Sequence, residues 1–309
     1  MKKFFTFFLL LAISFAGFAG TVRKETYIYN IAEGDTLRMD VYRAAIEEPA
    51  PAVLFAFGGG FVGGHRDNAS YLPLFEFLAN NGVTAISVDY RTLLSNLNPG
   101  MLSSFSYMAD RLVDAITCAT TDYLSATGYV LAKSGDLGVN PGLLFACGSS
   151  AGAITALQAE YELCKSTGGI AGFPPAFNYA GVISMAGAIC SDGAPEWTRT
   201  PAPMLLFHGD ADSNVPFGDA TVHDMGLWGS DPISKSLAEK GVNHWFHIFK
   251  GADHSVSMSP MTAHCGEILD FIHAVAAAKV NMVRTVETVR TDEYKTQFTL
   301  EDYIKANFK

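Results

Sequence analysis

The sequence predicts an α/β fold with a mostly parallel central sheet, helices on both faces of that sheet and an N-terminal antiparallel hairpin. Two observations carry the prediction. Short runs that are apolar throughout alternate with segments of helical periodicity, and this alternation is typical of a parallel sheet with crossover helices. The chain has 309 residues, of which 49% are hydrophobic, and this is enough to bury one large core.

The hairpin is predicted first, at residues 26–31 and 37–44, because these runs flank the turn sequence Glu33-Gly34-Asp35. Buried strands follow it along the chain. They are predicted at residues 52–57, 83–89, 143–147, 180–185, 204–208 and 245–249.

Helices are predicted between and after these strands. The first, over residues 71–80, ends at Asn81-Gly82, a common helix stop. Two more have apolar residues on one face, over residues 108–119 and from Ile154 onward. The last begins at Ser259-Pro260, a polar residue followed by a proline in the first turn, and keeps its apolar face as far as Val275.

The two ends of the chain depart from this pattern. Residues 1–19 combine two lysines, an apolar run and small residues near the end, which predicts a signal peptide and a secreted or periplasmic protein. The apolar run is shorter than the ~20 residues of a membrane span, so a membrane anchor is the weaker alternative. We expect no stable membrane insertion after cleavage. Residues 281–309 form a polar extension of unknown role, in which Thr299 and Asp302 indicate a capping box.

Charge and cysteine content exclude other classes of protein. The net charge is −10 and becomes −12 once Lys2 and Lys3 leave with the signal peptide, so nucleic acid is not an expected partner. The five cysteines are an odd number, which leaves at least one without a partner in the chain. Cys147 lies in an apolar run and is expected to be buried. No Cys or His spacing indicates a metal site, and no metal ligand is assigned.

Residues 148–152, G-S-S-A-G, fit the pattern G-x-S-x-G. In this pattern a strand turns sharply into a helix with the serine at the apex, and side chains in place of the glycines would clash. The predicted strand before it and the predicted helix after it supply that context. Ser150 is therefore the candidate nucleophile, and the alternative is a purely structural strand–turn–helix.

Residues 57–61, F-G-G-G-F, follow the first predicted buried strand. Bare glycines let backbone N–H groups approach a carbonyl oxygen that becomes negative during acyl transfer. We assign Gly59, Gly60 and Ala151 to such an oxyanion hole. A phosphate-binding loop would need a lysine followed by serine or threonine, and a dinucleotide-binding loop a different glycine spacing.

The candidate base and acid follow the last two buried strands, at the edge where parallel sheets build their sites. Among the eight histidines, His254 is the one in a loop directly after the last predicted strand of the core, so it is the candidate base. Asp210, Asp212 and Asp253 compete as the acid that orients this histidine. The greater distance of Asp212 from its strand end favours it.

Taken together, these segments resemble the α/β-hydrolases of the esterase/lipase superfamily, and most closely bacterial carboxylesterases with an H-G-G-G oxyanion loop. The resemblance covers about residues 51–278, includes the D-Y-R sequence at 89–91, and has nucleophile, acid and base in the family order. It implies the α/β-hydrolase fold, residues 20–280 as the catalytic domain, Asp212 as the acid and a structural role for 89–91. Phe57 replaces the loop histidine that braces this loop in the family, so a different brace is expected.

These features predict a serine carboxylic-ester hydrolase that acts through an acyl-enzyme and requires no cofactor or metal. No large cap domain fits between the strands ending at Met185 and beginning at Met204, so the site is open to a bulky alcohol. Acetyl or feruloyl esters of carbohydrates are the expected substrates. Met225, Leu227 and Trp228, in the loop after Asp212, either line a pocket or simply pack. The alternative functions are a serine peptidase of the same fold and a non-catalytic binding protein on a hydrolase scaffold.

Overall fold

The structure of the chain is a computed structural model, and it describes most of the sequence. The described residues are 21–44, 49–97, 105–165, 170, 172–174, 176–222, 225–278, 283–289 and 305. The predicted signal peptide and the predicted capping box at Thr299 and Asp302 lie outside these residues.

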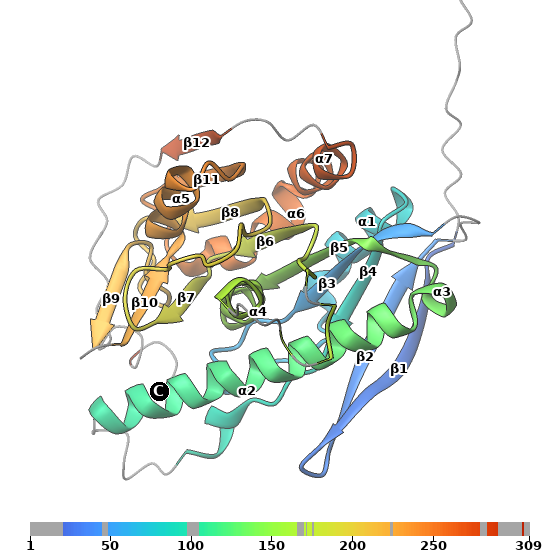
Figure 1. The fold of residues 1–309 in the computed structure, drawn as a ribbon, viewed down its shortest axis with the longest axis horizontal. Coiled ribbons are helices and arrows are strands. Elements are labelled where there is room, and N and C mark those ends of the chain that lie inside the picture. Colours follow the sequence, from blue (N-terminus) through green and yellow to red (C-terminus); the bar gives the residue numbers. More distant parts are fainter. Residues whose placement is uncertain are drawn as a thin grey trace, which may run out of the picture.

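A nine-stranded mixed sheet forms the centre of the molecule, in the order β1-β2-β4-β3-β5-β6-β8-β11-β12 (Figure 1). The predicted hairpin is present as β1 and β2, which pair antiparallel, and β2 is also antiparallel to β4. All other pairs in this sheet are parallel. The strands are β1 Arg23–Ala32, β2 Asp35–Arg43, β3 Ala50–Ala56, β4 Thr84–Val88, β5 Val139–Ser149, β6 Gly181–Met185, β8 Met204–Gly209, β11 His244–Lys250 and β12 Arg284–Val289.

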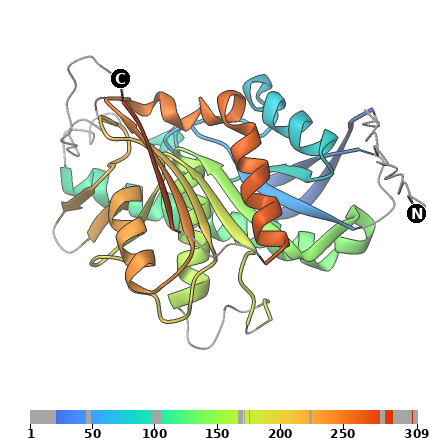
Figure 2. The same cartoon turned by 90° about the horizontal axis from the view of Figure 1, so that it is seen from above.

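Helices cover both faces of the sheet, as predicted. Helices α1 (Leu72–Asn80) and α7 (Cys265–Ala276) lie on one face, and α2 (Phe105–Ala132), α4 (Ala151–Lys165) and α5 (Ser230–Glu239) lie on the other (Figure 2). Every residue of β4, β6 and β8 is buried as a result. This double cover explains why the central strands are apolar throughout instead of alternating.

The described part of the chain also contains short helical segments. They are η1 Ala69–Tyr71, η2 Leu93–Asn96, α3 Ser134–Leu137 and η4 His254–Ser257. The helix predicted from Ser259 is interrupted: α6 (Pro260–Ala263) ends at His264, whose ψ of 21° leaves the helical range, and α7 begins at Cys265.

Two strand regions were not predicted. A second, antiparallel sheet contains β7 (Ala188–Ser191), β10 (Met225–Gly229) and β9 (Asp219–Val222) in that order. The prediction that residues 225–228 form a loop is therefore wrong, since they form β10. Strand β12 comes from the polar segment after residue 280 and extends the main sheet beside β11.

The cysteines and the helices bear on two further expectations. All five cysteines are free thiols, and Cys147 is fully buried on β5, as its apolar surroundings predict. In the described part of the chain, no helix combines the length and the apolar character needed to cross a membrane.

Candidate active site

Ser150 stands at a sharp turn between β5 and α4. Its φ of 53° lies in the left-handed region, which non-glycine residues rarely adopt, and its N–H donates to the carbonyl of Met185 at 2.9 Å. A Cβ on Gly148 would lie 2.1 Å from the carbonyl oxygen of Gly152, and a Cβ on Gly152 would lie 2.1 Å from that of Ala56. The two glycines of the pattern are therefore required by the close approach of backbone.

Three side chains from distant segments meet at this turn in one line. The hydroxyl oxygen of Ser150 lies 2.7 Å from Nε2 of His254, and Nδ1 of His254 lies 2.7 Å from Oδ2 of Asp212. A proton on Nδ1, donated to the carboxylate, leaves Nε2 as an acceptor for the serine hydroxyl. The structure thus places the three predicted residues in the order that general-base activation of a serine needs.

Asp212 is held by its own loop. Its side chain is fully buried, and its second oxygen, Oδ1, accepts the N–H groups of Asn214 at 2.8 Å and Val215 at 3.0 Å. These two bonds fix the carboxylate so that Oδ2 faces His254.

The two rival aspartates are engaged elsewhere. Asp210 accepts the N–H of Gly251 at 2.6 Å, and Asp253 caps η4 by accepting the N–H of Ser255 at 3.1 Å. Both stabilise the loops around the site, while Asp212 is the one that contacts His254.

A second histidine, His208 near the end of β8, also contacts Asp212. It is completely buried, and its Nε2 lies 3.5 Å from Oδ2 of Asp212 and 3.3 Å from the carbonyl of Val215. Its Nδ1 lies 2.8 Å from the hydroxyl of Ser230. Burial alone would raise the pKa of the Asp212 carboxyl, but hydrogen bonds from His208 and His254 lower that pKa well below its usual range. The acid is therefore ionised throughout the neutral range.

In the sequence, His208 ends a predicted buried strand and begins the H-G-D-A-D run at 208–212 that forms part of the family resemblance, but the pattern predicts no role for its side chain. The available signal was its polarity, since every other residue of β8 except the terminal glycine is apolar. A buried polar side chain requires partners, and in this chain the partner is the acid four residues later.

The loops that carry the three residues are also joined to one another. The hydroxyl of Ser149 donates to the carbonyl of Ser257 at 2.8 Å, which ties the nucleophile turn to η4. The N–H of Ala211 donates to the carbonyl of Ala252 at 3.1 Å, which ties the acid loop to the base loop. These hydrogen bonds between loops hold Ser150, His254 and Asp212 in their relative positions.

A narrow recess lies beside Ser150. Its lining residues are Gly60, Phe61, Ser150, Ala151, Ile154, Asn214 and Val215. Two of the three predicted oxyanion residues, Gly60 and Ala151, therefore border the space next to the nucleophile. Gly59 is exposed and does not line it; the Gly59 carbonyl accepts the N–H groups of Val62 and Gly63 and closes the loop.

The glycine loop has the different brace that the phenylalanine at its start led us to expect. The ring of Phe57 stacks on Tyr90, with ring centroids 4.2 Å apart, and the Tyr90 hydroxyl donates to the Phe57 carbonyl at 2.7 Å. The N–H of Gly58 donates to the Tyr71 hydroxyl at 3.3 Å.

The first and last residues of the D-Y-R sequence at 89–91 form ion pairs. Asp89 pairs with Arg66 and Arg91 with Asp122, both at 2.9 Å. The residues at 89–91 are therefore structural, as the resemblance implies. On β10, Leu227 is buried and Trp228 half-buried, and neither lines the recess beside Ser150.

The chain was compared with known families, curated proteins and solved structures. No family model and no curated protein matches the chain. Solved structures of an esterase from the planctomycete Thermogutta terrifontis do match. The propionate-bound form is 19% identical over 84% of this chain and 96% of that one, with a TM-score of 0.59. The apo form is 21% identical over 83% and 96%, with a TM-score of 0.58.

The chain has the α/β-hydrolase fold. A third structure of the same esterase, phosphoramylated by tabun, is 20% identical over 84% of this chain and 96% of that one, with a TM-score of 0.59. At these identities the likeness shows the fold, and the chemistry has to be argued from the site itself.

Proposed function

We propose that this α/β-hydrolase-fold protein is a serine carboxylic-ester hydrolase that works through an acyl-enzyme. The observation that carries the proposal is the line from the Ser150 hydroxyl through His254 to the buried carboxylate of Asp212, with both bonds at 2.7 Å. A purely structural turn would not need a strained serine hydrogen-bonded to a histidine that is itself oriented by an ionised carboxylate.

The geometry supports a two-stage reaction. Ser150 Oγ attacks the ester carbonyl while its proton passes to Nε2 of His254, and the carbonyl oxygen becomes negative. His254 then protonates the departing alcohol as the ester C–O bond breaks, which leaves the acyl group on Ser150. Water attacks this acyl-enzyme by the same steps, and Asp212 stabilises the imidazolium in both stages.

The oxyanion is assigned to the recess beside Ser150. Gly60 and Ala151 line this space, and their backbone N–H groups are assigned as the donors, each of which is typically worth about 3 kcal/mol of transition-state stabilisation in such a hole. Gly59, the third predicted donor, is assigned the role of shaping the turn, since its carbonyl accepts two N–H groups of its own loop. This assignment makes the loop a member of the H-G-G-G type with Phe57 in the histidine position.

The recess also bears on the acyl group. It is narrow, and the buried side chains of Phe61, Ile154 and Val215 line it. A narrow recess with this apolar lining favours a short acyl group such as acetyl over feruloyl. The similar esterase has solved structures with propionate and with butyrate bound, which supports a preference for short chains.

We further propose that the natural substrates are acetyl esters of carbohydrates outside the cytoplasm. The predicted signal peptide supports export. The short connection between β6 and β8, which contains only β7 among its described elements, supports access for a bulky alcohol. Activity on acetylated xylan above that on long-chain triglyceride is the expected result, and the reverse order would overturn this part of the proposal.

The reaction class is tested with two serine variants and a fluorophosphonate probe. Ser150→Ala is expected to lose labelling and to reduce kcat for p-nitrophenyl acetate by about 10⁶-fold. Ser255→Ala, which changes an exposed serine beside His254, is the matched control and should keep both. Labelling or hydrolysis that survives in Ser150→Ala would refute the assignment, and a wild type that does neither would identify a binding protein.

A further inference from the structure

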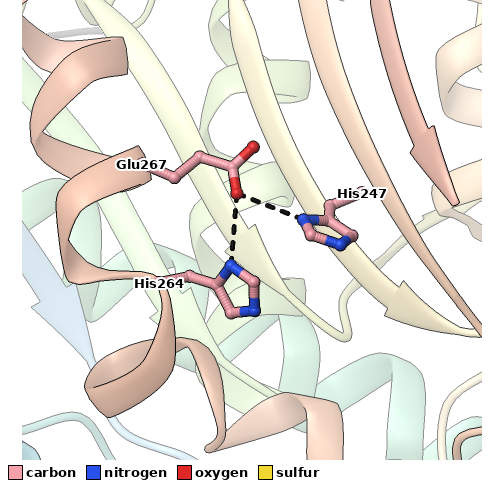
Figure 3. A group of neighbouring side chains, drawn as sticks. All are labelled: His247, His264 and Glu267. Carbon is pink, nitrogen blue, oxygen red and sulfur yellow. Dashed lines mark hydrogen bonds and ion pairs between the residues drawn. The ribbon is translucent and has the colours of Figure 1, made fainter. Parts of the chain in front are cut away.

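A cluster of two histidines and one glutamate lies outside the candidate active site. His247 lies on β11, His264 immediately precedes α7, and Glu267 lies in the first turn of α7 (Figure 3). Oε2 of Glu267 lies 3.1 Å from Nδ1 of His247 and 3.3 Å from Nδ1 of His264. Within the described residues, no other group of this kind brings three potential ligand atoms within 4.8 Å of one another.

We propose that His247, His264 and Glu267 bind a zinc ion that joins β11 to α7. In a tetrahedral zinc site with bonds of about 2.0–2.1 Å, neighbouring ligand atoms lie ~3.3 Å apart. The two distances to Glu267 Oε2 match that spacing. Two imidazoles and one carboxylate favour zinc over magnesium or calcium, which prefer ligand sets made of oxygen. A water molecule would complete the fourth position.

The surroundings of the three ligands fit this use. Nε2 of His247 lies 2.9 Å from the hydroxyl of Thr288 on β12, and a metal-bound histidine usually donates its other N–H to such an acceptor. The second oxygen of Glu267, Oε1, faces Arg284 at 3.7 Å, so Oε2 alone is directed at the histidines. The Arg284 guanidinium lies over the ring of Trp245, 5.2 Å from its centroid.

The cluster is only partly buried, so an ion can enter it from solvent. The side chain of His247 is 6% exposed and that of Glu267 is 14% exposed, while His264 at 24% forms the open side. Each Nδ1 must be free of hydrogen to become a ligand, so the single ring proton of each neutral histidine lies on Nε2 in the zinc-bound form. The Thr288 hydroxyl can then accept from Nε2 instead of donating to it, since a hydroxyl serves both roles.

The position in the chain suggests what the ion does. Residues 247 and 264–267 bracket His254, the candidate base, on η4. A zinc ion would therefore close a loop around η4 and fix both ends of the segment that carries this histidine. The role is structural, and it is independent of the reaction assigned to Ser150.

Isothermal titration of untagged, chelator-treated protein with ZnCl₂ tests the proposal directly. One equivalent is expected to bind with micromolar or tighter affinity and to raise the melting temperature. His264→Ala and Glu267→Gln are expected to weaken binding by ~100-fold or more, and Thr288→Val, which changes only the outer partner, by 10–100-fold. His273→Ala, an exposed histidine on the same helix, should bind as the wild type does.

Two results would overturn the proposal. The first is no stoichiometric zinc binding by the wild type, which would show that the cluster is only a hydrogen-bond network. The second is unchanged binding in both His264→Ala and Glu267→Gln, each with the circular dichroism spectrum of the wild type. Because the readout is metal affinity, the outcome is independent of whether the chain hydrolyses esters.

Discussion

Replacing the acid Asp212 by asparagine separates its charge from its shape. Oδ1 of Asp212 accepts two backbone N–H groups, from Asn214 and Val215, and an amide NH₂ cannot take that position. In Asp212→Asn the amide oxygen must therefore face the backbone, and the NH₂ group must face Nδ1 of His254. That nitrogen then becomes an acceptor, the ring proton moves to Nε2, and Nε2 can no longer take the proton of Ser150.

The magnitude follows from the loss of the correct tautomer. An aspartate-to-asparagine change of this kind costs about 10⁴ in kcat in serine hydrolases built on the same triad, or about 5.4 kcal/mol of activation free energy. The assay is the steady-state kcat for p-nitrophenyl acetate at pH 7. Because asparagine has the shape of aspartate, KM should change far less than kcat.

The matched control is Asp210→Asn. Asp210 is buried in the same loop and accepts one backbone N–H, from Gly251, but it does not contact His254. This variant should keep its kcat to within about tenfold, since no group of the triad changes protonation. If Asp212→Asn keeps kcat within tenfold of the wild type, or if Asp210→Asn loses as much, the tautomer argument is refuted.

Three further perturbations test the framework. Burial raises the pKa of Glu160 to about 7, so the folded chain keeps a proton that the unfolded chain releases, and the unfolding free energy falls as pH rises between about 4.5 and 7. Urea denaturation at pH 5 and pH 8 should show the wild type losing about 2.5 kcal/mol more than Glu160→Gln; equal losses would contradict this. Gly152→Ala forces a Cβ to within 2.1 Å of the Ala56 carbonyl oxygen and should cost about 3 kcal/mol or more in thermal unfolding, whereas an unchanged melting temperature would count against the packing argument. Tyr90→Phe removes the hydroxyl that donates to the Phe57 carbonyl; it should cost about 1 kcal/mol of stability and lower kcat/KM several-fold, and wild-type values for both would show that the loop has another brace.

The sequence predicts best those strands whose side chains are all buried in the apolar core. Strands such as β4 and β8 are buried on both faces, and their apolar runs mark them directly. Strand β12 is exposed at every residue except Val286, which is half-buried, so its sequence has no continuous apolar run. It forms a strand because β11 offers a free edge, and that edge is a property of the assembled sheet.

The site shows the same division. Ser150, Asp212 and His254 could be found because each follows a strand end in a short sequence pattern. The polarity of His208 marks it within an apolar strand, but neither its role nor that of Ser149 can be assigned from the sequence, because both depend on contacts made in the fold, with residues 212 and 257. For the histidine–glutamate cluster the available signal was the i, i+3 spacing of His264 and Glu267, but the third member, His247, is distant in sequence and becomes a neighbour only when β11 packs beside α7.

The order of strands explains why His254 lies between Ser150 and Asp212 and contacts both. Ser150 follows β5 and Asp212 follows β8, and β6 lies between these strands. Strands in a sheet are about 4.8 Å apart, so the two chain segments begin ~10 Å from each other, too far for a serine to meet an aspartate directly. The imidazole of His254, brought over from β11 by its loop, fills this gap with a nitrogen toward each partner. Strand β6 contributes as well, because the carbonyl of Met185 at its end accepts the N–H of Ser150 and fixes the strained turn. The parallel order β5-β6-β8-β11 therefore sets the spacing that the imidazole of His254 bridges.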